Sequence, residues 1–124
     1  MSNHLGNVLA TVSDKKIGHS TDGTTIDYYT AAVVTANDYY PGGMTLPGRK
    51  YSQPYTNYRY GFNGKENDNE IKGEGNQQDY GMRIYDPRLG RFLSVDPLAN
   101  DFPWWTPYQF AGNTPNNTID LDGM

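Results

Sequence analysis

Aspartates that lie near Pro or Gly, together with one arginine, are the residues of this chain best suited to carry chemistry. Arg83 and Asp96 lie in the segment "YGMRIYDPRLGRFLSVDPLA" (80–99), and Asp120 lies in the terminal "IDLDGM". Two carboxylates held close together cannot both ionise freely, so one stays protonated as an acid while the other serves as base or nucleophile. A nearby arginine holds the ionised carboxylate or a developing oxyanion. The three side chains would form an aspartate-type site if folding brought them together.

The same aspartates have a purely structural interpretation. Asp beside Pro or Gly is most often a turn former: Asp86 and Asp96 precede Pro, Asp122 precedes Gly, and Asp120 lies three residues before Gly123. The residues alone favour this turn interpretation and do not establish that Asp96 and Asp120 meet.

Other patterns of catalytic or ligand-binding residues are missing. The chain has no Cys, and His4 and His19 lack spaced acidic or imidazole partners, so no metal site is expected. There is no nucleophilic Ser with a His partner and no phosphate-binding Gly-Lys loop, so no cofactor site is expected. The runs "DNE" and "DLD" fall short of the ligand count of a calcium loop. Trp104 and Trp105 could form a sugar-stacking platform, although aromatic residues that seal a shell are the favoured interpretation.

The composition indicates a chain that can fold but is poorly self-sufficient. In 124 residues with a net charge of −4 there is no basic stripe, which argues against capture of nucleic acid or of an anionic membrane. Neither a secretory signal nor a membrane-spanning segment is visible. Leu, Ile and Val are sparse, and 11 Tyr and 2 Trp supply much of the apolar area. With 14 Gly and 8 Pro, short strands and turns are favoured over long helices.

The first half of the chain is expected to form strands. Residues 4–16, "HLGNVLATVSDKK", predict a short strand that ends in a turn, although helical spacing also fits their Leu and Val. Residues 24–40, "TTIDYYTAAVVTANDYY", are the clearest strand, which Pro41-Gly42-Gly43 ends. Residues 47–57, "PGRKYSQPYTN", predict a surface connection.

The second half begins with alternating aromatic residues from Tyr58 to Phe62, and Asn63-Gly64 then predicts a type I′ hairpin turn. Residues 65–78, "KENDNEIKGEGNQQ", are too polar for a core strand and predict an exposed or mobile excursion. The proline-broken tail allows a turn or two of helix at 107–111, with Gly112 as its stop.

Between these segments, residues 80–95 predict a hairpin. Tyr80, Met82 and Ile84 would share one strand face, with Arg83 and Tyr85 on the other. The simplest register leaves Asp96 on the face opposite to Arg83, and a one-residue bulge in the turn would bring the two onto the same face.

The turn of this hairpin, "DPRLG", has three residues with a structural role. Asp86 can bond its own following backbone, Pro87 fixes φ, and Gly90 can take the left-handed conformation.

Taken together, "YGMRIYDPRLGRFLSVDPL" and the later "YQFAGNTPNNTIDLDGM" resemble the Rhs repeat-associated core domain, and "HLGNV" and "YRYGFNGKE" extend this resemblance over nearly the whole chain. The resemblance implies a mainly β fold, with antiparallel strands and hairpins of a tyrosine-aspartate (YD) repeat shell and a short irregular or helical C-terminal segment. Residues 1–57 would be a YD-repeat-like strand region with its connection, and residues 58–124 the core domain. In that family the shell is a β-sheet cocoon around a toxic C-terminal segment.

The resemblance also implies which residues cleave the chain. The family's terminal signature, Pro, four residues and Asp-Pro-x-Gly-Leu, matches Pro115, Asp120 and Gly123, whereas Leu121 replaces the usual proline and Met124 the usual leucine.

The family's second aspartate and its arginine fall on Asp96 and Arg83, which gives Arg83, Asp96 and Asp120 as the expected self-cleaving residues. The chain stops at Met124, where the resemblance places the scissile bond, as expected of a cleaved product or of a truncated reading frame.

The expected function is therefore to close a β-shell that encapsulates a C-terminal toxin or effector, with inherited aspartate-dependent self-cleavage and no turnover catalysis. Its partners would be the upstream YD-repeat shell and the toxin segment, or further copies that pair through strand edges. The family suggests secretion or delivery to a cell surface. Two alternatives stay open: a carbohydrate- or protein-binding module that uses exposed Tyr and Trp, and an orphan fragment without independent function.

Overall fold

Two antiparallel sheets contain all the strands, and helix is limited to single turns. The computed structural model describes residues 1–124. The first sheet has the order β1-β2-β3: Ala10–His19, Tyr28–Tyr39 and Thr45–Ser52. The second has the order β4-β5-β6-β7: Glu66–Asn67, Gln78–Asp79, Ile84–Asp86 and Arg91–Phe92. The helical pieces are α1 (Asn69–Lys72) and the 3-10 turns Phe62–Gly64 and Ala111–Asn113. The expectation of a mainly antiparallel β fold is confirmed.

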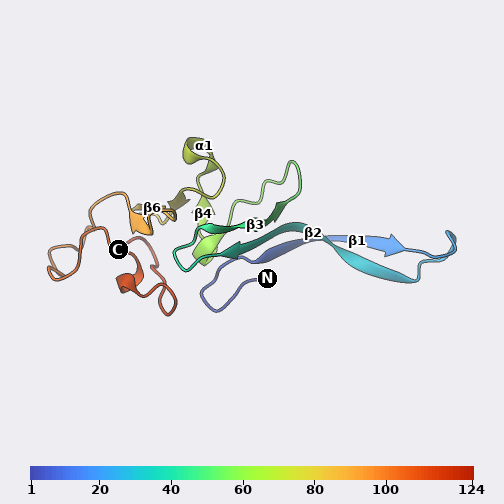
Figure 1. The fold of residues 1–124 in the computed structure, drawn as a ribbon, viewed down its shortest axis with the longest axis horizontal. Helices are drawn as coiled ribbons and strands as arrows, with labels where there is room; N and C mark the ends of the chain where they lie inside the picture. Colours follow the sequence, from blue (N-terminus) through green and yellow to red (C-terminus); the bar gives the residue numbers. More distant parts are fainter.

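The first sheet is a long hairpin with a short third strand. Figure 1 shows β1 and β2 reaching far to one side as an arm, while the C-terminal segment lies at the opposite end of the molecule. The expected turn at Ser13–Lys16 is wrong, because β1 continues through these residues. Its regular pairing with β2 is interrupted after Val12↔Val33 and resumes at Lys16↔Ala31. A β-bulge of this kind absorbs extra residues without ending the strand.

The third strand corrects the expectation that residues 47–57 are a surface connection. Residues up to Ser52 belong to β3, which pairs with β2 at Thr35↔Ser52 and Ala36↔Tyr51. Pro47 is compatible with this strand because β3 lies at the edge of the sheet, where a missing N–H leaves no ladder bond unmade.

The Asn63-Gly64 turn is confirmed. Both residues have positive φ, +51° and +69°, and the Lys65 N–H donates to the Phe62 carbonyl at 3.0 Å, as a type I′ turn requires. The turn buries Phe62 to 1% exposure.

Residues 65–78 are not the exposed excursion that their polarity predicts. They form β4, α1 and β5, and Gln78 is only 1% exposed. Their polar side chains bond one another: Gln78 Nε2 donates to Asn67 Oδ1 at 3.2 Å, and Gln77 Nε2 donates to Asp68 Oδ2 at 2.9 Å. These bonds offset part of the cost of burying polar side chains, and Gln78 Oε1 is left without a donor.

The hairpin after residue 80 is shorter than expected. Only Ile84–Asp86 and Arg91–Phe92 are strands, and Gly81, at φ +95°, bends the chain before β6. The bend overturns the predicted face pattern, because Tyr80 is buried together with Tyr85 while Met82 is 58% exposed.

The turn of the hairpin is as predicted. The Arg88 N–H donates to Asp86 Oδ1 at 3.0 Å, and Gly90 takes a positive φ of +65°. The pairs are Tyr85↔Phe92 and Asp86↔Arg91, which is the shifted register and not the simplest one.

An aromatic cluster forms the core of the C-terminal half. Tyr85 and Phe110 stack with their ring centroids 4.2 Å apart. The expected helix at 107–111 is absent: Phe110 is extended and inserts into the core, and Gly112 lies inside the 3-10 turn at φ +60°. No helix has the length and apolar character to cross a membrane. The core consists of Phe62, Tyr80, Tyr85, Phe92, Phe110 and Ala111.

Candidate functional site

Arg83 is the centre of the candidate site, and its side chain is fully buried. Its Nη2 atom lies 3.0 Å from Asp96 Oδ2 and 3.8 Å from Asp120 Oδ2. The guanidinium carbon lies 3.8 Å from the centre of the Phe92 ring, so the aromatic face covers the cation. Arg83, Asp96 and Asp120, which the sequence predicts as one site, are therefore brought together.

The hairpin register positions Asp96. The pairing is shifted by one residue from the simplest register, and extending it past both strand ends would put Arg83 and Asp96 on the same face, as the bulge predicts. The chain leaving β7 is then held against the tail: the Asp96 N–H donates to the Pro107 carbonyl at 2.8 Å, and Asp96 Oδ1 accepts from the Leu98 N–H at 2.8 Å.

The C-terminal loop positions Asp120. Asp120 Oδ1 accepts the Gly123 N–H at 2.8 Å, while the Gly123 carbonyl accepts from Arg83 Nε. The Met82 N–H also donates to the Asp122 carbonyl at 3.0 Å. Gly123 has a positive φ of +74°, and a Cβ there would lie 2.9 Å from the Arg83 backbone nitrogen. The loop reaches Arg83 because residue 123 has no side chain.

Burial sets the proton affinity of this site. Burial raises the pKa of Asp120, opposed by hydrogen bonding from Gly123 and by the charge of Arg83. Burial also lowers the pKa of Arg83, opposed by the charges of Asp96 and Asp120. Asp120 is thus the carboxyl that tends to keep its proton, while Asp96 forms the close ion pair with Arg83. One acidic and one basic carboxyl group around one cation can carry out proton transfer in both directions.

The remaining predicted residues lie at different distances from this cluster. Asp86 is buried elsewhere, where Lys72 Nζ at 3.0 Å and Arg88 NH2 at 2.7 Å bind it, and Pro87 and Gly90 complete its turn. Pro115 borders a separate hollow, whose walls include His4 and Phe62. Met124 lines a groove together with Asp120.

That groove contains residues that the sequence did not single out. It has a volume of about 540 Å³. Gln109 is buried, and its Oε1 has no hydrogen-bond donor. Gln109 belongs to the quoted segment "YQFAGNTPNNTIDLDGM", but nothing in that segment marks it as a functional residue. The groove is lined by Trp105, Gln109, Ile119, Asp120, Leu121 and Met124, among others.

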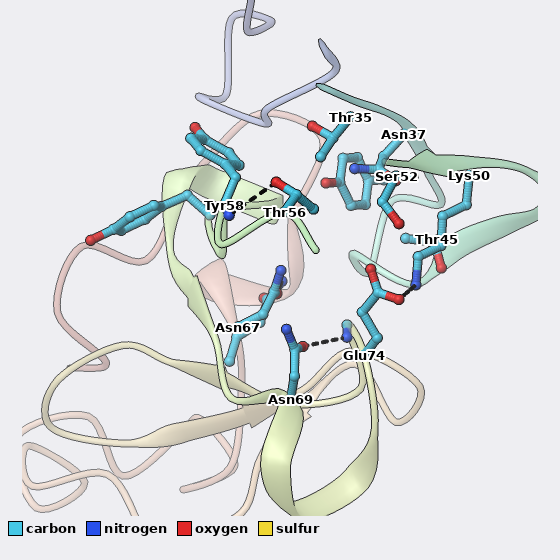
Figure 2. Close-up of a pocket in the computed structure, with 14 residues that line it drawn as sticks. Thr35, Asn37, Thr45, Lys50, Ser52, Thr56, Tyr58, Asn67, Asn69 and Glu74 are labelled. Carbon is cyan, nitrogen blue, oxygen red and sulfur yellow. Dashed lines mark hydrogen bonds and ion pairs between the residues drawn. The ribbon is translucent and has the colours of Figure 1, made fainter. Parts of the chain in front are cut away.

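A second hollow lies between the two sheets, and Figure 2 shows residues of β2 and β3 facing Asn67, Asn69 and Glu74 across it. Lys50 Nζ and Glu74 Oε2 form an ion pair across it at 3.0 Å. Its free volume is about 30 Å³. Ligand pockets usually measure roughly 300–1,000 Å³, so this hollow is too small for a sugar ring.

Trp104 and Trp105 lie at the surface of the chain. Trp104 is 71% exposed, and Trp105 stacks on Phe102 with ring centroids 5.3 Å apart. No group of three or more His, Cys, Asp or Glu side chains is placed to hold a metal ion.

The chain is related in sequence to segments of much longer proteins. It is 39% identical over 93 residues to salivary gland surface protein 1 of Aedes aegypti, which covers 74% of this chain and 2% of that protein. It is 34% identical over 93 residues to toxin subunit YenC2 of Yersinia entomophaga (74% of this chain, 9% of the relative). Toxin subunit YenC1 of the same organism is 33% identical over 112 residues (90% of this chain, 11% of the relative). No protein-family model matches the chain.

The fold is similar to part of solved structures of much longer chains. The crystal structure of TcdB2-TccC3-Cdc42 matches with a TM-score of 0.61 and 23% identity over 88% of this chain and 5% of the other. The crystal structure of TcdB2-TccC3 matches with a TM-score of 0.60 and 24% identity at the same coverage. The relation to toxin subunits and the shared fold agree with the Rhs-type resemblance at the level of the family.

Proposed function

We propose that this chain is the closing part of an Rhs/YD-repeat β-shell that encapsulates a C-terminal toxin or effector, and that Arg83, Asp96 and Asp120 cleave the polypeptide next to Met124. Residues 1–57 would supply strands that pair with an upstream shell, and residues 58–124 the core domain. The relation to segments of the toxin subunits YenC1 and YenC2 supports the first part of this proposal.

The observation that carries the cleavage proposal is the sharing of one buried guanidinium by two carboxylates. Structural ion pairs usually need one acidic partner per arginine, and a second buried carboxyl group adds a desolvation cost. Here Asp120 is buried beside the Arg83–Asp96 pair and also bonds the backbone of Gly123. An acidic group so close to the backbone at residue 123 is well placed to act on a peptide bond that follows Met124.

In the proposed reaction a water molecule attacks the carbonyl carbon of the peptide bond after Met124. Asp96 takes a proton from this water while Asp120 gives its proton to the carbonyl oxygen, which forms a tetrahedral intermediate. As this intermediate collapses, Asp96 passes its proton to the leaving nitrogen and Asp120 takes one back from a hydroxyl of the intermediate. The carbon–nitrogen bond breaks, leaving a carboxyl group on Met124 and an amine on the released segment. Arg83 balances the charge that passes between the two carboxyl groups.

Intact mass spectrometry tests this proposal on the chain carrying a reporter peptide after Met124 and a shell-forming sequence upstream. We expect a product that ends at Met124 in the parent, and loss of at least about a hundredfold in rate in Asp96→Asn and in Asp120→Asn, as for removal of a general acid or base. Asp101→Asn, an exposed change in the same half of the chain, is the matched control and should cleave like the parent.

Leu121 is a further check, because the family's signature has proline there. A Leu121→Pro, Met124→Leu version restores the signature and should cleave at least as fast as the parent. If both versions stay whole, or if the two Asn variants are cut as fast as the parent, the cleavage proposal is wrong.

A second candidate function is that of a binding module, favoured by the exposure of Trp104 at 71%. An exposed indole face is suited to stacking against a sugar ring or a partner's apolar surface. Binding of the chain to a glycan array would support this function if the Trp104→Ala variant no longer binds. If the array gives no signal, the shell proposal is the one that remains.

A further inference from the structure

The groove beside Asp120 is not explained by the three residues of the proposed site. Its volume of about 540 Å³ lies within the usual range of roughly 300–1,000 Å³ for a binding site. Its walls come from the loop around Trp105, the 3-10 turn at Ala111 and the terminal loop 118–124. The reacting carboxyl group of Asp120 and the side chain of Met124 both lie in this groove, so any residue joined to Met124 starts there.

Gln109 borders the groove and carries a hydrogen-bond acceptor that no donor in the chain reaches. Its residue is 6% exposed, and its buried Oε1 accepts from no donor in the chain. Leaving a buried polar atom unpaired costs free energy, which a bound group with an N–H would recover. Gln109 also lines the groove, together with Asp120. A peptide backbone supplies such N–H groups at regular spacing.

The other walls set the side-chain preference. Trp105, Ile119 and Leu121 are large apolar residues that face a groove with only Asp120 and Asp122 as charged members. Trp105 is 43% exposed and Leu121 68% exposed, so both have apolar surface still to bury. An apolar side chain would gain from this surface, whereas an acidic one would meet two carboxyl groups.

We propose that this groove binds, in extended form, the peptide that follows Met124, with Gln109 Oε1 accepting one of its backbone N–H groups and a bulky apolar side chain packing on Trp105. The groove would thereby hold the scissile bond against Asp120 and give the cleavage a preference for large apolar residues just after the cut. This inference rests on the proposed self-cleaving function.

Photo-crosslinking tests the docking without depending on cleavage. The chain is extended by a short peptide with benzoylphenylalanine as the second residue after Met124, in an Asp96→Asn background that leaves every groove residue in place. Mass spectrometry then locates the crosslinks. We expect most of them at residues 105–121, at about fivefold higher yield than from the same probe ten positions further along the peptide.

Two matched variants make the test specific. Trp105→Ala, which removes a groove wall, should lower the crosslink yield about fivefold, and Trp104→Ala, its exposed neighbour outside the groove, should leave the yield unchanged. Gln109→Met, which keeps the size but removes the acceptor, should lower it about threefold. Circular dichroism and urea unfolding of each variant show whether the fold is intact.

Crosslinks spread evenly over the chain, or equal yields from the Trp104 and Trp105 variants with intact folds, would overturn the docking proposal. A variant that loses its fold is replaced by Trp105→Leu or Gln109→Leu, with the same expectations. If the peptide docks but the parent fusion is not cleaved, the docking proposal holds and the proposed self-cleaving activity is wrong.

Discussion

Gly123 shows at the scale of one residue how the candidate site depends on backbone geometry. A Cβ at this position would lie 2.9 Å from the Arg83 nitrogen and 3.2 Å from Tyr80 Cβ. The glycine also donates its N–H to Asp120 and accepts from Arg83 through its carbonyl. The backbone of Gly123 therefore links Asp120 to Arg83, and it can come this close because the residue has no side chain.

We expect Gly123→Ala to lower the free energy of unfolding by about 2–3 kcal/mol, from positive-φ strain together with the steric clash. Gly23→Ala is a matched control: its φ is +73°, against +74° for Gly123, but a Cβ there meets nothing within 4 Å. That variant should lose only about 1 kcal/mol, from strain alone. Urea unfolding measures both, and equal losses would show that Gly123 is not in close contact with Arg83.

At the scale of elements, Asp86 ties α1 to the β6–β7 turn. Its carboxylate, 2% exposed, binds Lys72 of α1 at 3.0 Å and Arg88 of the turn at 2.7 Å. Hydrogen bonds from Arg88 and Lys72 hold the pKa of Asp86 well below its usual value, against the opposing effect of burial. A group whose pKa is lowered by folding contributes stability that is present above its unfolded pKa and lost as pH falls.

The stability of the chain should therefore decrease as pH falls from about 4 toward 2. Asp86→Asn should reduce this acid loss and lower stability at neutral pH, because two cations then lose their buried partner. Asp120 affects stability in the opposite direction. Burial raises its pKa, so its contribution to the stability of the fold is full at low pH and decreases as pH rises through its folded pKa. Urea unfolding midpoints measured at several pH values check both pH dependences. If the Asp86→Asn variant loses as much stability between about pH 4 and 2 as the parent, Asp86 does not have the role described.

The sequence predicts those elements that depend on local chemistry. The Asn63-Gly64 turn, the Gly90 turn and the strand of residues 28–39 follow from residue types that favour one backbone conformation. β3 and the ordered segment 65–78 escape prediction because they are stabilised by pairing with other strands, such as Gln78 with Tyr85 of β6. Local polarity carries no information about such partners.

The candidate site divides in the same way. The meeting of Arg83, Asp96 and Asp120 follows from the family resemblance and from the bulged register, whereas periodicity alone leaves Asp96 on the wrong face. The place of Gln109 and Trp105 beside Asp120 could not be predicted, because only the folded tail makes them neighbours.

At the scale of the whole molecule, burial is uneven between the two sheets. All members of the aromatic core come from the C-terminal half. In β1, β2 and β3 only Ala32 and Thr35 are buried, while Tyr28, Tyr29 and Tyr51 are at least half exposed. The long hairpin arm in Figure 1 thus lacks a partner layer, and β1 and β3 are open edges.

We expect the isolated chain to be marginally stable and to associate through these edges. Amide exchange should be at least about tenfold faster in β1 and β2 than in β6 and β7, because little apolar surface protects the arm. Light scattering should show mass rising with concentration. A strictly monomeric sample with strong protection across residues 28–39 would contradict both expectations.

The contact between the terminal loop and Arg83 also has a consequence for the order of events during synthesis. Domains fold from the N-terminus as the chain leaves the ribosome. Arg83 and Asp96 emerge early and pair, but Asp120 and Gly123 must emerge before the second carboxyl group is in place. The ribosome still encloses the residues translated after them at that moment. The complete site is therefore assembled only after the first residues of any following segment have been made.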